Sequence, residues 1–257
     1  MEKIRLFSIS AFVLLLFSIS SAFAMSPFGP PKAGLTQGQY DLGVDYSYSQ
    51  FCMEFGNGKY YSGGGNGSMP SFTKNKMKMD TVTGRLGYGF SDCWEGFFRL
   101  GGARMRNSED GERFDSDGCA YGLGTKVTFV QDDRIDWGAL FQVDWTTVDG
   151  DWDGPGWTGS ADVDIMQMVV AVGPTYKLDD KTSIYGGPFW YCLDGEKKYY
   201  EKSPDPTWKE EYDLDECSSC GAFIGTEIKF GSNSVMNIEY QLTDDDDTIG
   251  ISLRWLF

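Results

Sequence analysis

The sequence predicts an all-β protein, a single antiparallel up-and-down transmembrane β-barrel of about ten strands, within a range of about eight to twelve. Apolar and polar residues alternate with a period of two through most of the chain, which is typical of strands with one apolar face. Beyond residue 24 no stretch is long and apolar enough to cross a membrane as a helix, so insertion would have to use strands. The connections between these segments also alternate between short and long.

The first 24 residues have the organisation of a secretory signal peptide. Lys3 and Arg5 precede an apolar run at 9–19, and Ala22-Phe23-Ala24 supplies small residues for cleavage. A retained membrane anchor is the alternative, but the run is shorter than the roughly 20 residues that a spanning helix needs. The sequence therefore divides into a signal peptide at 1–24, a short N-terminal extension at 25–36 and a barrel at 37–257.

The last nine residues form the clearest strand. From Ile249 to Phe257 every second residue is apolar, and the chain stops on an aromatic side chain. This ending resembles the C-terminal signal of bacterial outer-membrane β-barrels, which the barrel-assembly machinery reads. The wider resemblance, over residues 37–257, is to the outer-membrane protein A and X-like barrels. It implies that Trp255 and Phe257 act as the assembly signal, and that the apolar faces meet outer-membrane lipid and lipopolysaccharide.

The remaining strand candidates follow one another from residue 40 onward, separated by turns of two kinds. Short polar turns are expected at 91–93, 131–134, 179–181 and 231–233, and longer segments at 51–78, 106–117, 148–163, 193–216 and 243–247. In outer-membrane barrels the short turns are periplasmic and the long loops extracellular, so both termini are expected in the periplasm. The alternative is a soluble exported ligand binder of the lipocalin type, whose apolar residues would point inward.

With the apolar faces turned to lipid, the barrel interior receives many charged residues. They are Asp41, Asp45, Arg85, Glu95, Arg99, Lys126, Asp144, Glu227, Lys229, Glu239 and Arg254. A charge in a narrow lumen needs a partner, so this nearly balanced set predicts a network of salt bridges. Two functions stay open: a filled barrel with a structural or surface-interaction role, and a narrow porin for small solutes or ions. Inward glycines such as Gly87, Gly124 and Gly225 leave room either for a conduit or for inward aromatic rings.

Six cysteines are present, at 52, 93, 119, 192, 217 and 220. An exported protein meets an oxidising compartment, where disulfides persist. We expect Cys192 to pair with Cys217 or Cys220, because these residues flank one long segment between neighbouring strands. The Cys-x-x-Cys spacing of 217–220 also suits zinc, but a second such pair and any histidine are missing, so no metal is assigned there.

The long segments are acidic and carry the candidate cation-binding residues. These are Asp149, Asp151, Asp153, Asp244, Asp245, Asp246 and Asp247. Clustered carboxylates suit hard cations such as Ca²⁺. A solvated acidic surface is the alternative, because residue 160 is Ser where an EF-hand loop would end in Glu. Apart from Ca²⁺, no cofactor is expected.

The overall charge and the residue types exclude two further classes of function. A net charge of −16 is a poor match for nucleic acid. The strand number resembles that of the omptin proteases, and the known barrel proteases, phospholipases and acyltransferases use histidine, which this chain lacks entirely. We therefore expect a monomer that is not an enzyme and does not bind nucleic acid.

Overall fold

The computed structural model describes residues 26–62, 65–69, 73–107, 115–154, 157–202, 208–216 and 219–257. The predicted signal peptide at 1–24 lies outside these ranges. Within them, no helix is long and apolar enough to cross a membrane. The strands are β1 (Tyr40–Ser62), β2 (Gly65–Met69), β3 (Thr73–Ser91), β4 (Trp94–Asn107), β5 (Asp115–Gln131), β6 (Ile135–Gly154), β7 (Trp157–Lys177), β8 (Thr182–Lys202), β9 (Trp208–Glu216), β10 (Cys220–Phe230), β11 (Ser234–Thr243) and β12 (Asp247–Leu256).

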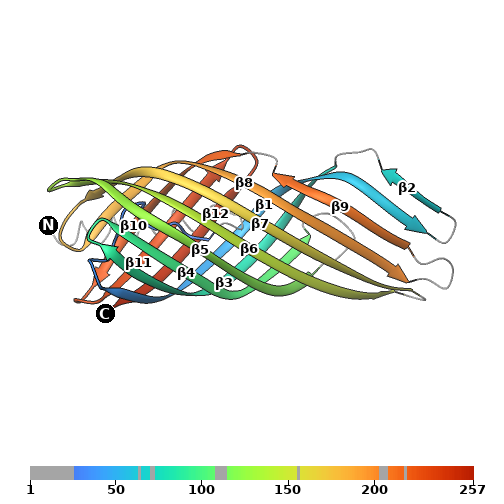
Figure 1. Cartoon of the computed structure of the whole chain (residues 1–257), viewed down its shortest axis with the longest axis horizontal. Helices are drawn as coiled ribbons and strands as arrows, with labels where there is room; N and C mark the ends of the chain where they lie inside the picture. The colour runs from blue at the N-terminus through green and yellow to red at the C-terminus, as the bar shows by residue number, and fades with distance from the viewer. Residues whose placement is uncertain are drawn as a thin grey trace, which may run out of the picture.

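The strands form one antiparallel sheet that closes on itself (Figure 1). The first long strand, β1, pairs with the last, β12, from Asp41–Leu256 to Gln50–Asp247. The other neighbours follow chain order with two exceptions: β2 lies off this path and pairs with β1, and β9 enters the wall between β8 and β1. The predicted fold class, an antiparallel up-and-down barrel of about ten strands in a range of eight to twelve, is therefore confirmed.

The two ends of the barrel differ, and we name them by this difference. The turn end carries the tight turns after β3, β5, β7 and β10 and the C-terminal residue Phe257. The extended end carries β2, β9 and the last parts of β1 and β8, which run on toward the right of Figure 1. All four predicted short turns lie at the turn end, within a residue of their expected positions.

The predicted long connections are mostly strand rather than loop. Segment 148–163 is the far part of the β6–β7 hairpin, and segment 193–216 is the far part of β8 together with β9. Val148 and Leu214 on these extensions point inward and are fully buried. The outer faces here are polar instead of apolar, so the contrast that marks a lipid-facing strand in the sequence is absent.

The strand faces are inverted relative to a soluble protein. Leu86, Phe129 and Trp255 point outward and are 51%, 56% and 45% exposed, whereas Arg99 and Glu95 point inward and are 0% exposed. An apolar belt on the outside and charged groups on the inside are typical of a barrel in lipid. This arrangement contradicts the soluble lipocalin alternative, which requires the apolar residues inside.

The lumen of the extended end is apolar, which the sequence analysis did not predict. Met53, Met77, Met79 and Met105 lie inside it and are at most 1% exposed. The aliphatic residues of the same cluster include Val148, Val163, Ile165, Leu193 and Leu214. Unbranched methionine side chains fill irregular gaps well, so this half of the barrel is packed like a protein core.

The filled lumen as the candidate functional site

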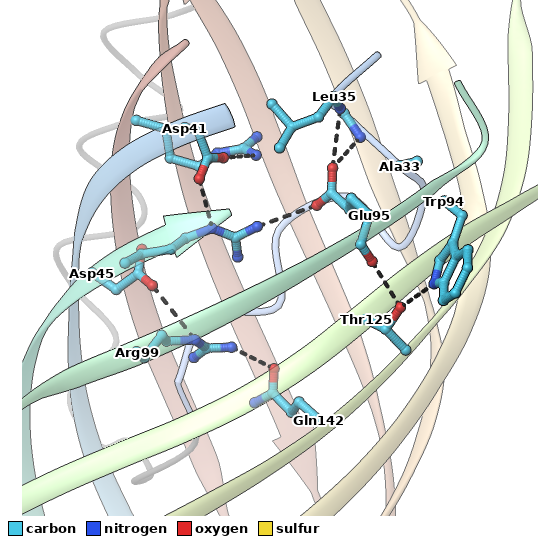
Figure 2. Close-up of polar contacts among 12 residues, drawn as sticks. Ala33, Leu35, Asp41, Asp45, Trp94, Glu95, Arg99, Thr125 and Gln142 are labelled. Atoms are coloured by element: carbon cyan, nitrogen blue, oxygen red, sulfur yellow. Dashed lines mark hydrogen bonds and ion pairs between the residues drawn. The ribbon is translucent and has the colours of Figure 1, made fainter. Parts of the chain in front are cut away.

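A chain of ion pairs crosses the lumen at the turn end (Figure 2). Arg85 contacts Glu95 and Asp41, with Nη2–Oε1 and Nε–Oδ1 distances of 3.2 and 3.5 Å. Arg254 contacts Asp41 and Glu227, with Nη1–Oδ2 and Nη2–Oε2 distances of 3.3 and 3.2 Å. Five strands thus contribute to one connected network, and all five side chains are buried. Each charge has an opposite partner, which a poorly solvated lumen requires.

A second layer lies next to this chain, around Arg99. Its Nη2 donates to Oε1 of Gln142 at 2.6 Å, and its Nε lies 3.7 Å from Oδ2 of Asp45. The Gln142 amide in turn donates to Asp144 at 2.8 Å. Arg85 and Arg99 are cross-strand neighbours in register, and like charges in that position repel. The ring centroid of Phe97 lies 4.0 and 4.8 Å from their guanidinium carbons, so both cations contact one aromatic ring.

The N-terminal segment, residues 26–36, lies inside the turn end and completes its filling. The backbone N–H groups of Phe28 and Gly29 donate to the two carboxylate oxygens of Glu239, at 2.8 and 2.9 Å. Those of Gly34 and Leu35 donate to Oε2 of Glu95, at 2.6 and 3.0 Å (Figure 2). Charge-assisted bonds of this kind are about twice as strong as neutral ones. Two lumen carboxylates therefore hold the segment at both ends.

Side-chain contacts anchor the segment between these two carboxylates. The ring of Phe28 packs edge-on against Phe189 and Phe223, with centroid distances of 5.4 and 5.3 Å. Lys32 forms a 2.7 Å ion pair with Asp136, which is buried at the start of β6. The segment begins Ser-Pro-Phe-Gly-Pro-Pro, and prolines lack the N–H that a place in a sheet requires. It therefore lies against the wall without joining it.

Inward glycines make room for this filling rather than for a conduit. A Cβ built on Gly89 would lie 2.1 Å from the carbonyl oxygen of Thr36, and one on Gly250 would lie 2.6 Å from Pro27. At Gly124 the space is taken by the Phe97 ring, at 2.3 Å. These positions need glycine because the N-terminal segment or an aromatic ring contacts the wall directly.

The structure brings ten of the eleven predicted lumen residues together and leaves out Lys229. Lys229 is exposed near the end of β10, at the turn-end rim, so it is not part of the network. Lys126 lies opposite Glu95 in the register and is buried. Sequence reasoning missed Asp136, Gln142 and the N-terminal segment itself. The proline-rich composition next to a strand was the one signal that could have indicated a segment lying against the wall.

The predicted disulfide between Cys192 and Cys220 is wrong. Cys220 is a free, exposed cysteine, and its register partner on β8 is Trp190. Cys192 is therefore a diagonal neighbour, and such residues lie about 7–8 Å apart, beyond the reach of a disulfide. Cys217, the other predicted partner, lies outside the described residues. Cys52 is disulfide-bonded, which the sequence analysis did not predict.

The acidic residues predicted to bind cations are dispersed or already engaged. Asp246 is buried and accepts hydrogen bonds from the Cys52 N–H and the Tyr191 hydroxyl, at 2.8 and 2.7 Å. Asp247 accepts one from Tyr240 at 3.0 Å, whereas Asp244 and Asp245 are exposed. Burial raises the pKa of Asp246, although its two hydrogen bonds partly offset this. In the described ranges no three Asp, Glu or Cys side chains are grouped to hold a metal ion.

Asp149 and Asp151 lie on the extension of β6, outside the lumen. Asp149 is flanked in the register by Asp117 on β5 and Asp162 on β7, so three carboxylates form one cross-strand row. The side chain of Asp153 lies outside the described residues. The repulsion between these like charges is screened, because this part of the wall is exposed to solvent.

No protein-family model matches the chain, and no curated protein sequence matches it. Several solved structures are similar. The translocator domain of the autotransporter NalP from Neisseria meningitidis is 12% identical, with 87% of this chain and 89% of that chain covered and a TM-score of 0.49. The outer membrane protein OprG from Pseudomonas aeruginosa is 11% identical, with 87% and 98% covered and a TM-score of 0.43.

The outer membrane protease OmpT from Escherichia coli is 8% identical, with 84% of this chain and 97% of that chain covered and a TM-score of 0.43. Identities and scores this low say nothing of what this chain binds or does. Its own closed wall, outward apolar belt and charged lumen decide the class. The chain has the fold of an outer-membrane β-barrel.

Proposed function

We propose that this protein is a monomeric outer-membrane β-barrel whose lumen is closed, and that it acts through its structure and its surface rather than by transport or catalysis. The observation that carries this proposal is the N-terminal segment held in the lumen by Glu95 and Glu239. Beyond it, the methionine and aliphatic cluster fills the extended end. A solute crossing the barrel would have to displace both layers.

Both termini belong in the periplasm and the extended end faces outside the cell in this proposal. The described C-terminus and the short turns share one end, which is the periplasmic arrangement of such barrels. The outer face of the extended end is polar and carries exposed ion pairs, such as Arg104–Asp115, which lowers the pKa of Asp115. A surface of this kind is suited to water and to lipopolysaccharide headgroups bridged by divalent cations, rather than to lipid tails.

The C-terminal residues support the proposed assembly route. The ring of Phe257 stacks on that of Tyr40 at 5.5 Å, and their backbones exchange hydrogen bonds of 2.9 and 3.3 Å. Phe257 therefore joins the last strand to the first. A residue in this position suits recognition by the assembly machinery, because it lies where the last strand meets the first.

Single-channel conductance in a planar lipid bilayer tests the closed lumen. The refolded protein that begins at Met25 is compared with a variant that lacks residues 26–36 and in which Met53, Met77, Met79 and Met105 are replaced by Ala, so that the segment and the methionine packing are both removed. We expect no steady conductance from the first and ohmic steps from the second, with folding of both checked by heat-modifiable gel migration. Steady steps from the undeleted protein would favour the narrow porin instead. Silence from both would show that the wall side chains, and not the segment, close the barrel.

A further inference from the structure

The outer face of the barrel changes from apolar to charged where the belt ends on β3 and β4. Val82 on β3 and Leu100 on β4 are the outward apolar residues nearest this edge, and they are 51% and 56% exposed. Tyr46 on β1 pairs with Val82 in the register, and its hydroxyl donates to Asp80 at 3.0 Å. Tyrosines of this kind are typical of the interface between membrane and water. The next outward residues of β3 and β4 therefore lie at the level of lipid headgroups.

These next outward residues include several cations. Lys76 and Lys78 point outward on β3, because Met77 between them points into the lumen and is 1% exposed. Arg106 points outward on β4 and pairs directly with Lys78 in the register. Lys78 lies about 7 Å along the strand beyond Asp80, and the headgroup layer on each side of a bilayer is about 5–8 Å thick. We call Lys76, Lys78 and Arg106 the cationic patch.

The cationic patch is not balanced by the carboxylates beside it. Lys78 and Arg106 are like charges directly opposite each other, which is unfavourable across a pair of strands. Asp80 contacts Arg106 and also accepts from Tyr46. Lys76 and Lys78 form no ion pair with a residue that the structure describes. Their ammonium groups therefore remain available to an anion that approaches the outer face.

The outer face carries the opposite charge farther around the barrel. From β6 to β8 the outward residues above the belt are mainly carboxylates, among them Asp149, Asp162, Asp164 and Glu196. These side chains repel a phosphate group, whereas the cationic patch attracts one. The charged zone above the belt is therefore divided into a side that favours anions and a side that disfavours them.

We propose that the cationic patch binds the phosphate groups of lipopolysaccharide, and that this lipid is thereby held against β3 and β4. A headgroup phosphate presents several acceptor oxygens, which the Arg106 guanidinium can bind through two parallel hydrogen bonds and the two lysines can bind as point charges. The acyl chains of the same lipid then lie against Val82 and Leu100, directly below the patch. The site rests on the proposed location in the outer membrane, which supplies such a lipid on this face.

Native mass spectrometry of the refolded protein in a neutral detergent tests this site, with lipid A that carries two phosphate groups as the probe. A chelator removes divalent cations, which could otherwise bridge phosphate to the acidic residues. Lys76→Gln/Lys78→Gln removes two charges without breaking an ion pair of the described residues, and Lys181→Gln/Lys229→Gln, at exposed positions of the turn end, is the matched control. We expect the Kd of the first variant to rise about tenfold or more, because two contacts to a charged group are lost. The Kd of the control should stay native.

Lipid A without phosphate groups should bind the native chain about as weakly as the phosphorylated lipid binds the first variant. An unchanged Kd in the first variant, or an equal rise in the control, would overturn the proposal. So would full competition by inorganic phosphate, which would make the patch a site for free anions, and so would native dimers that disappear in the first variant, which would place a second copy there. Membrane fractionation of cells tests the location separately: a chain absent from the outer membrane would contradict the proposed function, whatever its affinity for the lipid.

Discussion

Arg254 shows how a charged residue can lie inside a membrane barrel. Its guanidinium is buried and contacts two carboxylates, Asp41 on the neighbouring strand β1 and Glu227 on β10, two strands away on the other side. Asp41 contacts Arg85 in turn, so the loss of one member leaves others buried without compensation. Burying the complete network costs little free energy, because each charge is paired. Removing one member costs much more, because it leaves an uncompensated buried charge.

Arg254→Ala is therefore expected to lower the free energy of unfolding by about 3–5 kcal/mol, the usual cost of removing one partner of a buried pair. Urea unfolding in micelles, followed by tryptophan fluorescence, measures it. Arg104→Ala is the matched control, since Arg104 pairs with Asp115 on the exposed outer face. Its loss should have a much smaller effect, because an exposed ion pair is screened by solvent. Equal losses in the two variants would contradict a buried network.

Asp246 should give the barrel a pH dependence of its own. Burial raises the pKa of Asp246 above the ordinary 3.8. At pH values between 3.8 and the raised pKa, the folded chain therefore binds more protons than the unfolded chain. Its contribution to stability is therefore greatest below about pH 4 and falls as the pH rises through the raised pKa. Asp246→Asn cannot titrate, so its stability relative to the native chain should increase over this range. Unfolding free energies of both proteins at several pH values check this, and parallel curves would contradict it.

At the scale of the elements, the N-terminal segment is bound as a ligand would be. Four of its backbone N–H groups meet two carboxylates, one side chain meets Asp136, and one ring meets two aromatic rings of the wall. None of these contacts requires the segment to be a strand. The wall strands prepare the site by presenting carboxylates, and by presenting glycine where the segment comes closest.

Gly89→Leu is expected to expel the segment, because the three atoms nearest to a Cβ at this position belong to Thr36 and Leu35. In a chain whose Met53, Met77, Met79 and Met105 are replaced by Ala, Gly89→Leu should give bilayer conductance steps like those of the chain that also lacks residues 26–36. Gly84→Leu is the control, since a Cβ there would meet only a carbonyl oxygen at 3.7 Å on the outer face. A folded but silent Gly89→Leu barrel would show that the segment can shift and still close the lumen.

At the scale of the whole molecule, closure depends on the first and last strands meeting. Ten register pairs join β1 to β12, and Tyr40 and Phe257 end this contact with a ring stack and two backbone bonds. A barrel has no free sheet edge only when this last contact forms. Phe257 therefore completes the contact between the first and the last strand.

Deletion of Phe257 should reduce the fraction of chains that reach the heat-modifiable, membrane-inserted form in cells by several-fold. The physical reason is the loss of the contact that closes the wall, together with the terminal aromatic. Phe230→Ala is the control, because Phe230 is similarly exposed on the belt but lies away from the closing pair. Semi-native gel electrophoresis of membrane fractions measures both. An equal reduction in the two variants would indicate a general loss of apolar belt surface.

The alternation of apolar and polar residues along the chain is enough to predict the wall of the barrel. Period-two alternation shows which side of a strand meets lipid, and it can be read from neighbouring residues alone. The strand faces, the short turns and ten of the eleven lumen residues could therefore be predicted. Lys229 was misplaced because alternation does not say where along a strand the lumen opens to water. The strand extensions at 148–163 and 193–216 were predicted as loops because their outer faces are polar. In a sequence, a strand with a polar outer face looks like a polar loop.

The filling of the barrel and the closing of its wall depend on contacts between residues far apart in the chain. The partners in the lumen are far apart in the chain, as Phe28 and Glu239 are, and no local pattern records such a distance. The entry of β9 between β8 and β1, and the bridge that Asp246 makes there, depend on register around the closed sheet. Register is fixed by the sum of many cross-strand contacts, and so it emerges only when the whole barrel is assembled.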